Sequence, residues 1–250
     1  MSEGLPEVLA AIEGVEGWLS EGQARCLFER AHAVEPGGAI VEIGSYRGRS
    51  TIVLARGADE GVTVFAVDPH GGGDRGPRQI RGAPEEGEAD RAAFEANLAR
   101  AGVAQRVTYL RLQSTAAINQ VNHTVDLVYV DGAHRYAPAL ADLVGWGERV
   151  RPGGVMLVHD AFSSVGVTLA ILRALAFGPQ FVYAGRVRSL AEYRRAPMAL
   201  GARARARNAA RQLAELPWFL RNVAIKLALV MKLRRLAGTL GHDGSQLWPY

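Results

Sequence analysis

The residues best suited to chemistry follow an apolar run near the start of the chain. Val41 to Thr51 read V-E-I-G-S-Y-R-G-R-S-T, so that an apolar stretch leads into a turn that contains Gly44 and Gly48. Asp68 closes the next apolar run, V-T-V-F-A-V-D. Glycine lets the backbone turn sharply and approach a ligand, and a carboxylate at a neighbouring strand end can accept both hydroxyls of a ribose. The pattern therefore predicts a nucleoside-binding site.

The spacing within this turn favours one kind of nucleoside ligand. A dinucleotide-binding fold uses G-x-G-x-x-G, whose extra glycine and helix N-terminus hold a pyrophosphate. Here Ser45 and Tyr46 follow Gly44, and the next glycine is Gly48. The turn is therefore suited to a ligand without a phosphate.

Short apolar runs alternate with helical stretches, which predicts a doubly wound, mostly parallel α/β sheet. We expect strands at Ala39 to Ile43, Val62 to Val67, Val107 to Leu110, Leu127 to Val130 and Val155 to Val158, and helices at Ser50 to Ala58, Asp90 to Ala101, Ala137 to Val150 and Val165 to Phe177. Because ligands bind beyond the carboxyl ends of such strands, the polar residues there should share one rim. These residues are Gly44, Ser45, Asp68 to His70, Gln113, Ser114, Asp131 to His134, His159 and Asp160.

Three regions surround this predicted core. Met1 to Ala33 reads as a helix with Trp18, Leu19, Cys26, Leu27 and Phe28 as its apolar set. A hairpin about Gly185-Arg186 would add antiparallel strands at one edge, which gives a seven-stranded sheet. His70 to Asp90 is long and rich in glycine, so it is either a mobile lid or a disordered insertion. We expect a helical cap at 1–35, a ligand-binding domain at 36–195 and a basic helical tail at 196–250.

Composition bounds the class of protein. The chain has 250 residues, 48% of them hydrophobic and 22% charged, which suits one α/β core with an extension. It has no uncharged apolar run long enough to span a membrane, and M-S-E-G-L-P-E is acidic where an export signal would be basic. We therefore expect a cytoplasmic protein, either free or peripheral at the inner face of the membrane.

The net charge of +4 is unevenly distributed. From Arg186 to Tyr250 there are 13 Arg or Lys and 3 Asp or Glu, which gives +10 and leaves −6 for the first 185 residues. Leu216 to Ala237 forms a cationic amphipathic helix on a helical wheel. This helix could dock on the domain or on a second subunit as in a homodimer, or lie on an anionic membrane. Contact with nucleic acid ranks last, because the domain is acidic and the tail lacks interleaved aromatics.

Four motifs in order, V-E-I-G-S-Y-R-G-R-S-T, V-D-P-H, V-Y-V-D-G-A-H-R-Y and R-P-G-G-V-M-L-V-H-D, resemble the class I S-adenosylmethionine-dependent methyltransferases. Within that superfamily they are similar to the bacterial branch called methyltransferase family 24, over roughly Trp18 to Asp160. The resemblance implies a Rossmann-like fold and S-adenosyl-L-methionine as cofactor. The implied cofactor-binding residues are Glu42, Gly44, Ser45, Gly48, Ser50, Asp68, Gln113, Ser114 and Asp131.

The resemblance also implies roles for individual residues. Asp68 would accept the ribose hydroxyls, Gln113 and Ser114 would flank the adenine, and Asp131 would lie near the reactive methyl. Two structural alternatives remain open: Glu42 could cap its own turn, and Ser114 could cap the helix that follows it.

Methyl transfer requires an aligned and deprotonated acceptor, and Asp131, His134, His159 and Asp160 are the groups available for this. One alternative is a divalent-metal site, for magnesium or manganese, built from Asp131, His159 and Asp160, although imidazole is a poor ligand for magnesium. Another is metal-free catalysis with His134 or His159 as general base. A third is a purely structural His159.

The leading functional hypothesis is O-methylation of a small molecule, a sugar or a lipid-linked glycan. Two alternatives stay open: a catalytically decayed scaffold that the basic tail anchors, and a nicotinamide-dependent oxidoreductase.

Overall fold

A computed structural model describes residues 4–73 and 82–242 of the chain. The strands are β1 Ala39–Ile43, β2 Thr63–Val67, β3 Val107–Leu110, β4 Val125–Val130, β5 Val150–Val158, β6 Phe181–Val187 and β7 Leu190–Arg195. The helices are α1 Leu5–Ala11, α2 Glu21–His32, α3 Arg49–Gly57, α4 Pro84–Arg100, α5 Ser114–Ala117, α6 Tyr136–Arg149, α7 Val165–Ile171, α8 Ala202–Leu213, α9 Leu216–Val230 and α10 Arg234–Thr239, with short turns η1 Ala104–Arg106 and η2 Leu172–Ala176.

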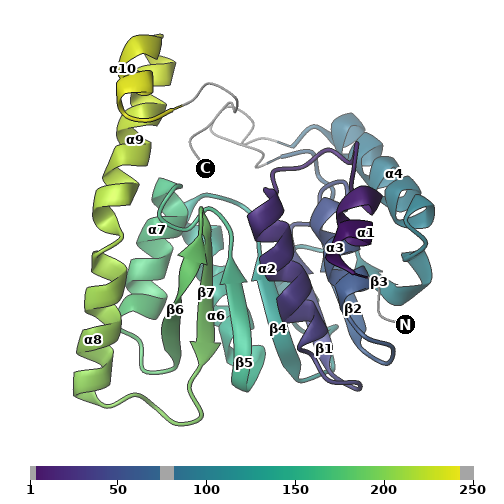
Figure 1. The fold of residues 1–250 in the computed structure, drawn as a ribbon. Coiled ribbons are helices and arrows are strands. Elements are labelled where there is room, and N and C mark those ends of the chain that lie inside the picture. The colour runs from purple at the N-terminus through teal and green to yellow at the C-terminus, as the bar shows by residue number, and fades with distance from the viewer. Residues whose placement is uncertain (1–3, 74–81, 243–250) are drawn as a thin grey trace.

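The seven strands form one sheet in the order β3-β2-β1-β4-β5-β7-β6 (Figure 1). β1 to β5 pair in parallel, whereas β7 is antiparallel to both β5 and β6. This arrangement confirms the predicted mostly parallel, Rossmann-like sheet with a C-terminal antiparallel pair. The order reverses between β1 and β4, so a ligand crevice is expected above these two strands.

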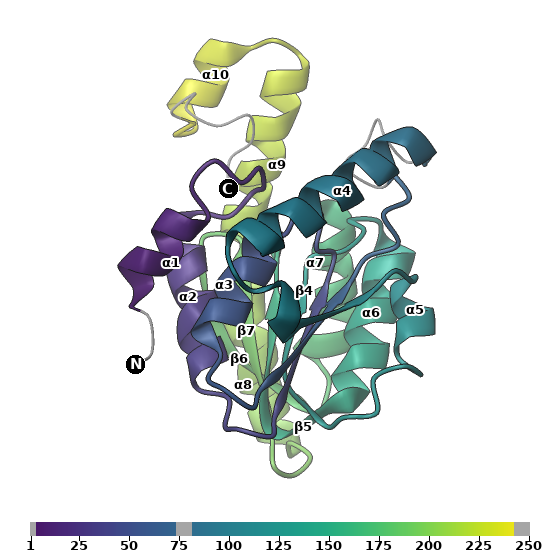
Figure 2. The same ribbon diagram turned by 90° about the vertical axis from the view of Figure 1, so that its right-hand side faces the viewer.

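Alternate residues of each parallel strand face opposite layers of helices, because side chains in a strand alternate with a period of two. In β1, Ile40 packs with α2, α3 and part of α4, whereas Val41 packs with α5, α6 and α7. Apolar side chains dominate both faces of the parallel strands, with Glu42 of β1 as a buried exception, which explains why the strands read as nearly continuous hydrophobic runs. Figure 2 shows the two layers edge-on.

The predicted N-terminal helix is wrong in one respect. α1 and α2 are separate helices joined by a loop that contains Trp18, whose side chain is 55% exposed and does not belong to a helical apolar face. The break has a local cause, because Ser20 and Gln23 form a reciprocal capping box that starts α2.

The predicted turn of the C-terminal hairpin is also wrong. The two strands turn at Arg188 and Ser189, and Gly185 lies inside β6. A register shift between Tyr183 and Gly185 produces a bulge there, with Gly185 at φ 141°. A bulge uses glycine for the same conformational freedom as a tight turn, so the sequence signal was ambiguous.

The long connection after β2 is shorter than predicted. α4 begins at Pro84 and not near Asp90 as expected. Proline is well tolerated at the first position of a helix, so Pro84 is compatible with this earlier start. The middle of the predicted lid, residues 74–81, lies outside the described residues. The hypothesis of a mobile or disordered loop therefore stays a prediction.

The basic tail forms helices α8 to α10, and α8 and α9 lie against the edge of the sheet that β6 occupies (Figure 1). In α8, the buried side chain of Asn208 accepts a hydrogen bond from the backbone N–H of Tyr183 at 2.8 Å. At the end of α8, Gln212 accepts one from the hydroxyl of Tyr193 at 3.2 Å. Among the described residues, no helix has the length and apolar character that crossing a membrane requires.

Candidate active site

The turn after β1 runs alongside the end of β4. Gly44 has φ 87°, and a Cβ at this position would lie 2.2 Å from the carbonyl oxygen of Asp131. Only glycine therefore lets the two strand ends approach this closely. Gly48 also has a positive φ of 85°, but a Cβ there would collide with Leu98 of α4 at 2.6 Å. Helix packing thus explains Gly48, whereas Gly44 borders the crevice.

Asp68 lies at the end of β2 and is held by two backbone donors. Its Oδ2 accepts from the N–H of Tyr46 at 2.9 Å and its Oδ1 from the N–H of His70 at 2.7 Å. A carboxylate oxygen can accept two hydrogen bonds, so each oxygen keeps capacity for a hydroxyl donor. Asp68 is thus held at the end of β2, and both of its oxygens can still accept a hydrogen bond from a ligand.

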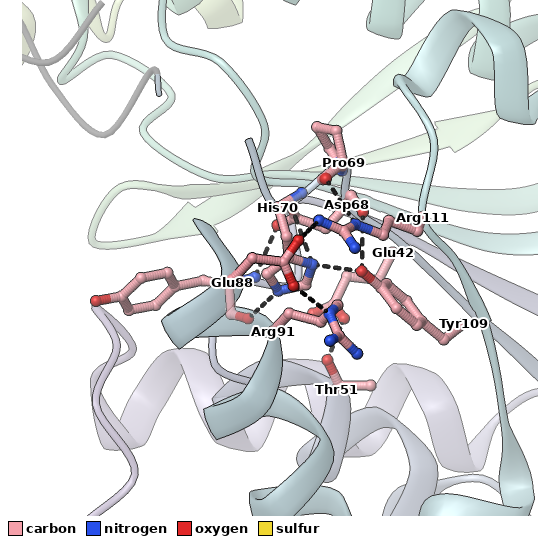
Figure 3. Close-up of polar contacts among 10 residues, drawn as sticks. Glu42, Thr51, Asp68, Pro69, His70, Glu88, Arg91, Tyr109 and Arg111 are labelled. Carbon is pink, nitrogen blue, oxygen red and sulfur yellow. Dashed lines mark hydrogen bonds and ion pairs between the residues drawn. The ribbon is translucent and has the colours of Figure 1, made fainter. Parts of the chain in front are cut away.

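His70 fixes the loop beneath Asp68. Its Nδ1 lies 2.6 Å from the hydroxyl of Tyr109 and its Nε2 lies 2.7 Å from the carbonyl oxygen of Tyr46 (Figure 3). A carbonyl can only accept, so Nε2 carries the proton. Arg111 extends the same network to α4 through an ion pair with Glu88. These contacts join the ends of β1, β2 and β3.

Glu42, next to last in β1, is completely buried and accepts hydrogen bonds from the hydroxyls of Ser50 and Thr51 in α3. Burial raises the pKa of Glu42 to about 7, although these two hydrogen bonds act in the opposite direction. Glu42 and Ser50 thus fasten the start of α3 to β1. By contrast, the hydroxyl of Ser45 is buried and makes no hydrogen bond of normal geometry among the described residues.

Asp131 follows β4 and faces the crevice. Its Oδ2 accepts a hydrogen bond from the buried hydroxyl of Tyr129 at 2.8 Å. Its Oδ1 lies 3.2 Å from Nδ1 of His159 and 4.0 Å from Nε2 of His134. Burial would raise the pKa of Asp131, but the two imidazoles outweigh burial and lower it. Asp131 is therefore a fixed negative charge beside Gly44.

His134 and Asp160 form the closest charge pair of the rim. Nε2 of His134 lies 3.0 Å from Oδ2 of Asp160. Burial would lower the pKa of His134, but Asp160 and Asp131 raise it to about 10. His134 remains 36% exposed, whereas Asp160 is buried. His134 is thus the more exposed of the two histidines, because His159 is buried.

His159 is buried between Asp131 and α2. Its Nε2 lies 3.3 Å from Nε2 of Gln23. The orientation of the Gln23 amide is set by its Oε1, which accepts from the backbone N–H of Ser20 at 2.9 Å, so its NH₂ group faces His159. Burial would lower the pKa of His159, whereas Asp131 and Asp160 raise it to about 9. Because the NH₂ group of Gln23 donates to Nε2 of His159, this ring nitrogen must nevertheless carry no proton. We therefore assign to His159 the neutral tautomer with its proton on Nδ1, facing Asp131.

The donor set of the rim does not suit the divalent metal that was one sequence-based alternative. His159 directs its lone pair at Gln23 and its proton at Asp131, and His134 is paired with Asp160. Within residues 4–73 and 82–242, no group of three or more His, Cys, Asp or Glu has a geometry that could hold a metal ion.

The residues predicted to flank an adenine lie at the end of β3. Gln113 is exposed and is the N-cap of α5, but its side chain makes no capping hydrogen bond. The hydroxyl of Ser114 donates to Asp142 and accepts from the indole N–H of Trp146 at 2.8 Å. Ser114 therefore ties α5 to α6 and is not the N-cap, so that structural alternative is wrong.

A small cavity of about 30 Å³ lies between the strand ends and the loop that joins α1 and α2. Trp18 and Tyr46 lie over it, with their ring centroids 5.5 Å apart. The hydroxyl of Tyr46 also donates to Glu16 in the same loop at 3.0 Å. The lining residues are Glu16, Gly17, Trp18, Leu19, Gly44, Ser45, Tyr46, Arg49, Ser50, Tyr129 and Asp131. A larger hollow of about 370 Å³ lies between α1, α2 and the start of α3, away from the strand ends.

Sequence reasoning did not identify four residues that shape this site: Gln23, Tyr109, Tyr129 and Lys226. Two of them left a signal. Gln23 occupies the third helical position of a capping box, and Tyr129 carries a hydroxyl among the apolar residues Leu127 to Val130 of β4. Tyr109 and Lys226 come from distant segments, and only the fold brings them to the rim.

Residues 41–161 match the family model described as a methyltransferase domain. This part of the chain is thus similar to methyltransferase domains. The match confirms the resemblance to class I S-adenosylmethionine-dependent enzymes, and its range includes the strand ends of β1, β2, β4 and β5.

Solved structures share the fold of this chain, O-methyltransferases among them. The cofactor-bound Rv0187 from MTB is 22% identical, with a TM-score of 0.55, over 77% of this chain and 89% of that chain. An O-methyltransferase from Bacillus cereus in complex with SAH is 20% identical, with a TM-score of 0.51, over 76% of this chain and 87% of that chain. The O-methyltransferase NovP is 15% identical, with a TM-score of 0.54, over 71% and 81%. At these identities the likeness concerns the fold of the methyltransferase.

Proposed function

We propose that this methyltransferase binds S-adenosyl-L-methionine above β1 and β4 and transfers its methyl group to an oxygen of a small molecule, a sugar or a lipid-linked glycan. The observation that carries the proposal is the position of Asp68, held by two backbone N–H groups and with acceptor capacity left on both oxygens. A vicinal diol such as that of a ribose fits two carboxylate oxygens. The sulfonium of the cofactor supplies an activated methyl group for an in-line displacement.

The crevice offers further groups with the chemistry that this cofactor requires. The buried hydroxyl of Ser45, without a hydrogen-bond partner of normal geometry among the described residues, lines the cavity together with Gly44. The negative charge of Asp131 complements the positive charge of a sulfonium or an ammonium group. Because ligand pockets usually measure about 300–1,000 Å³, the loop that carries Trp18 must move away from Tyr46 to admit the cofactor.

His134 is the proposed general base for the acceptor hydroxyl. It is the most exposed member of the cluster, and Asp160 stabilises the imidazolium that forms when His134 takes a proton. His159 is proposed to position Asp131, because both of its ring nitrogens already face protein groups.

Calorimetric titration with S-adenosylhomocysteine and, separately, with NAD tests the proposal. We expect the wild-type protein to bind S-adenosylhomocysteine and not NAD. Asp68→Ala should weaken this binding by about 1.5–3 kcal/mol, the usual contribution of hydrogen bonds to a charged group. Asp59→Asn is the matched control, because Asp59 is an exposed carboxylate that pairs with His32 and does not lie at the crevice. Equal affinity of the Asp68→Ala and wild-type proteins would remove Asp68 from the cofactor site.

A further inference from the structure

The amphipathic helix α9 packs on the domain with polar side chains directed inward. Asn222 is fully buried, and its amide lies 3.4 Å from the carbonyl oxygen of Phe162. One turn later, the ammonium group of Lys226 donates to the carbonyl oxygen of Ser163 at 3.0 Å. Both acceptors belong to the turn that follows β5. Asn222 and Lys226 of α9 therefore use their polar groups in binding the domain.

This orientation leaves much of the apolar side of α9 in solvent. Leu220 is 63% exposed, Leu227 57%, Val230 61% and Met231 67%. Spacings of seven, three and one residues place these side chains along one side of a helix. Single exposed leucines are common on protein surfaces, but a continuous apolar row marks a binding surface. We call these four residues, with Leu233 before α10 and Leu236 within it, the apolar stripe.

Only positive charges accompany the apolar stripe. Residues 216–242 contain Arg221, Lys226, Lys232, Arg234 and Arg235, and no Asp or Glu. Lys232, Arg234 and Arg235 are exposed in and around α10. The occupant of the stripe should therefore be apolar at its centre and negatively charged around it.

A second copy of the chain and a single-stranded nucleic acid both fit this surface less well. In a two-fold symmetric dimer the same patch meets itself, so the cations of both copies would face each other without carboxylates of the stripe to pair with. Single-stranded nucleic acid binds through exposed aromatic rings. On α9, however, Trp218 and Phe219 pack against the core, and Arg186 stacks on the ring of Trp218 at 3.8 Å from its centroid.

We propose that α9 and α10 lie on an anionic lipid surface. The apolar stripe would insert between the headgroups, and Lys232, Arg234 and Arg235 would pair with lipid phosphates. Apolar side chains flanked by Lys and Arg are the characteristic features of helices that lie in a membrane interface. Anionic lipids add a favourable electrostatic contribution for each exposed cation near the surface.

The position of the stripe relates membrane contact to the candidate active site. α9 rises past the carboxyl ends of β4 and β5, and α10 lies beyond them (Figures 1 and 2). His159 and Asp160 follow β5 at this end of the sheet. A membrane that contacts α10 would therefore lie on the same side of the molecule as the rim.

Flotation of the full-length protein with lipid vesicles tests the proposal. We expect binding to vesicles of equal parts phosphatidylglycerol and phosphatidylcholine, weaker binding at high salt, and none to vesicles of phosphatidylcholine alone. The double variant Leu227→Glu/Val230→Glu should bind at least about tenfold more weakly, because it places two negative charges in the inserted surface. Val144→Glu is the matched control, since Val144 is a 46% exposed residue of α6, outside the stripe, and should bind as the wild type does.

Circular dichroism of each variant confirms that the fold is retained, since all three side chains are exposed in the native structure. Wild-type protein that does not float with anionic vesicles would overturn the proposal, as would a folded double variant that floats like the wild type. Sedimentation equilibrium identifies the rival occupant. Self-association that the double variant abolishes, without vesicle binding by the wild type, would assign the stripe to a second copy of the chain.

Discussion

At the scale of single residues, the rim places one reachable imidazole between two carboxylates. Asp160 and Asp131 hold His134 in its protonated form at neutral pH, whereas Gln23 favours the neutral ring of His159. Two histidines that are 25 positions apart in the sequence thus have different chemical roles, and their hydrogen-bond partners make the difference.

His134 should give the enzyme an alkaline pH profile. Because the pKa of His134 is raised to about 10, the neutral base becomes more abundant as the pH rises. We expect kcat/KM to increase about tenfold per pH unit below that pKa, and His134→Gln to lower activity and remove this dependence. Measuring kcat/KM between neutral pH and pH 10 checks the prediction, with His32→Gln, an exposed histidine, as control. A wild-type profile that is flat over this range would contradict the role of base.

Glu42 should make stability depend on pH in the opposite sense to a salt-bridged carboxylate. Its folded pKa of about 7 lies above the ordinary value of 4.5, so the folded state binds the proton more tightly than the unfolded state. This tighter proton binding stabilises the folded state by up to about 3 kcal/mol. The contribution is complete below pH 4.5 and is lost as the pH rises through 7.

Urea unfolding of the wild type and of Glu42→Gln at pH 5 and pH 8 measures this effect. The neutral amide does not ionise, so the variant should gain stability relative to the wild type as the pH rises. Glu35→Gln, at an exposed position before β1, should show no such gain. Parallel curves for Glu42→Gln and the wild type would show that Glu42 is not perturbed.

At the scale of elements, α9 supports the turn from which Asp160 projects. Asp160 and Phe162 both have positive φ values, 55° and 54°, which non-glycine residues rarely adopt. Lys226 holds this turn through the carbonyl of Ser163. The tail helix therefore contributes to the geometry of the rim, although it lies outside the range that the family model matches.

Lys226→Met should lower turnover by about tenfold, because a loosened turn misplaces Asp160 relative to His134. Methionine keeps the apolar length of the side chain, so the packing of α9 is largely retained. Steady-state kinetics with S-adenosylmethionine should show the loss mainly in kcat. Arg207→Met, which removes an exposed cation from α8, serves as the control. Equal loss in both variants would indicate a general effect of tail charge.

At the scale of the whole molecule, the predicted cap, domain and tail share contacts with one sheet. Arg30 of α2 pairs with Glu192 of β7 at 3.0 Å, and Gln23 donates to Ser189 at 3.2 Å. Tyr193 of β7 in turn donates to Gln212 of α8. The C-terminal hairpin thus links the N-terminal helices to the tail.

These links predict a single unfolding transition. Thermal melts followed by far-ultraviolet circular dichroism and by tryptophan fluorescence should coincide, because the predicted cap and tail cannot leave without exposing the sheet edge. Gln212→Ala, at a fully buried position, should lower the midpoint of both signals together. A separate early transition would show that the tail, residues 196–250, unfolds as an independent unit.

The parallel core, the strand-end motifs and the uneven charge could be predicted from the amino-acid sequence. These features depend on local periodicity and on residue order, so β1, β2, β4 and β5 could be placed and Asp68, Asp131, His159 and Asp160 assigned to one edge. The tertiary structure alone decided which side of α9 faces the domain, since the buried acceptors at Phe162 and Ser163 attract its polar groups. It also decided that Ser114 binds α6 and that Gln23 reaches His159, because contacts between segments distant in sequence depend on how the layers pack.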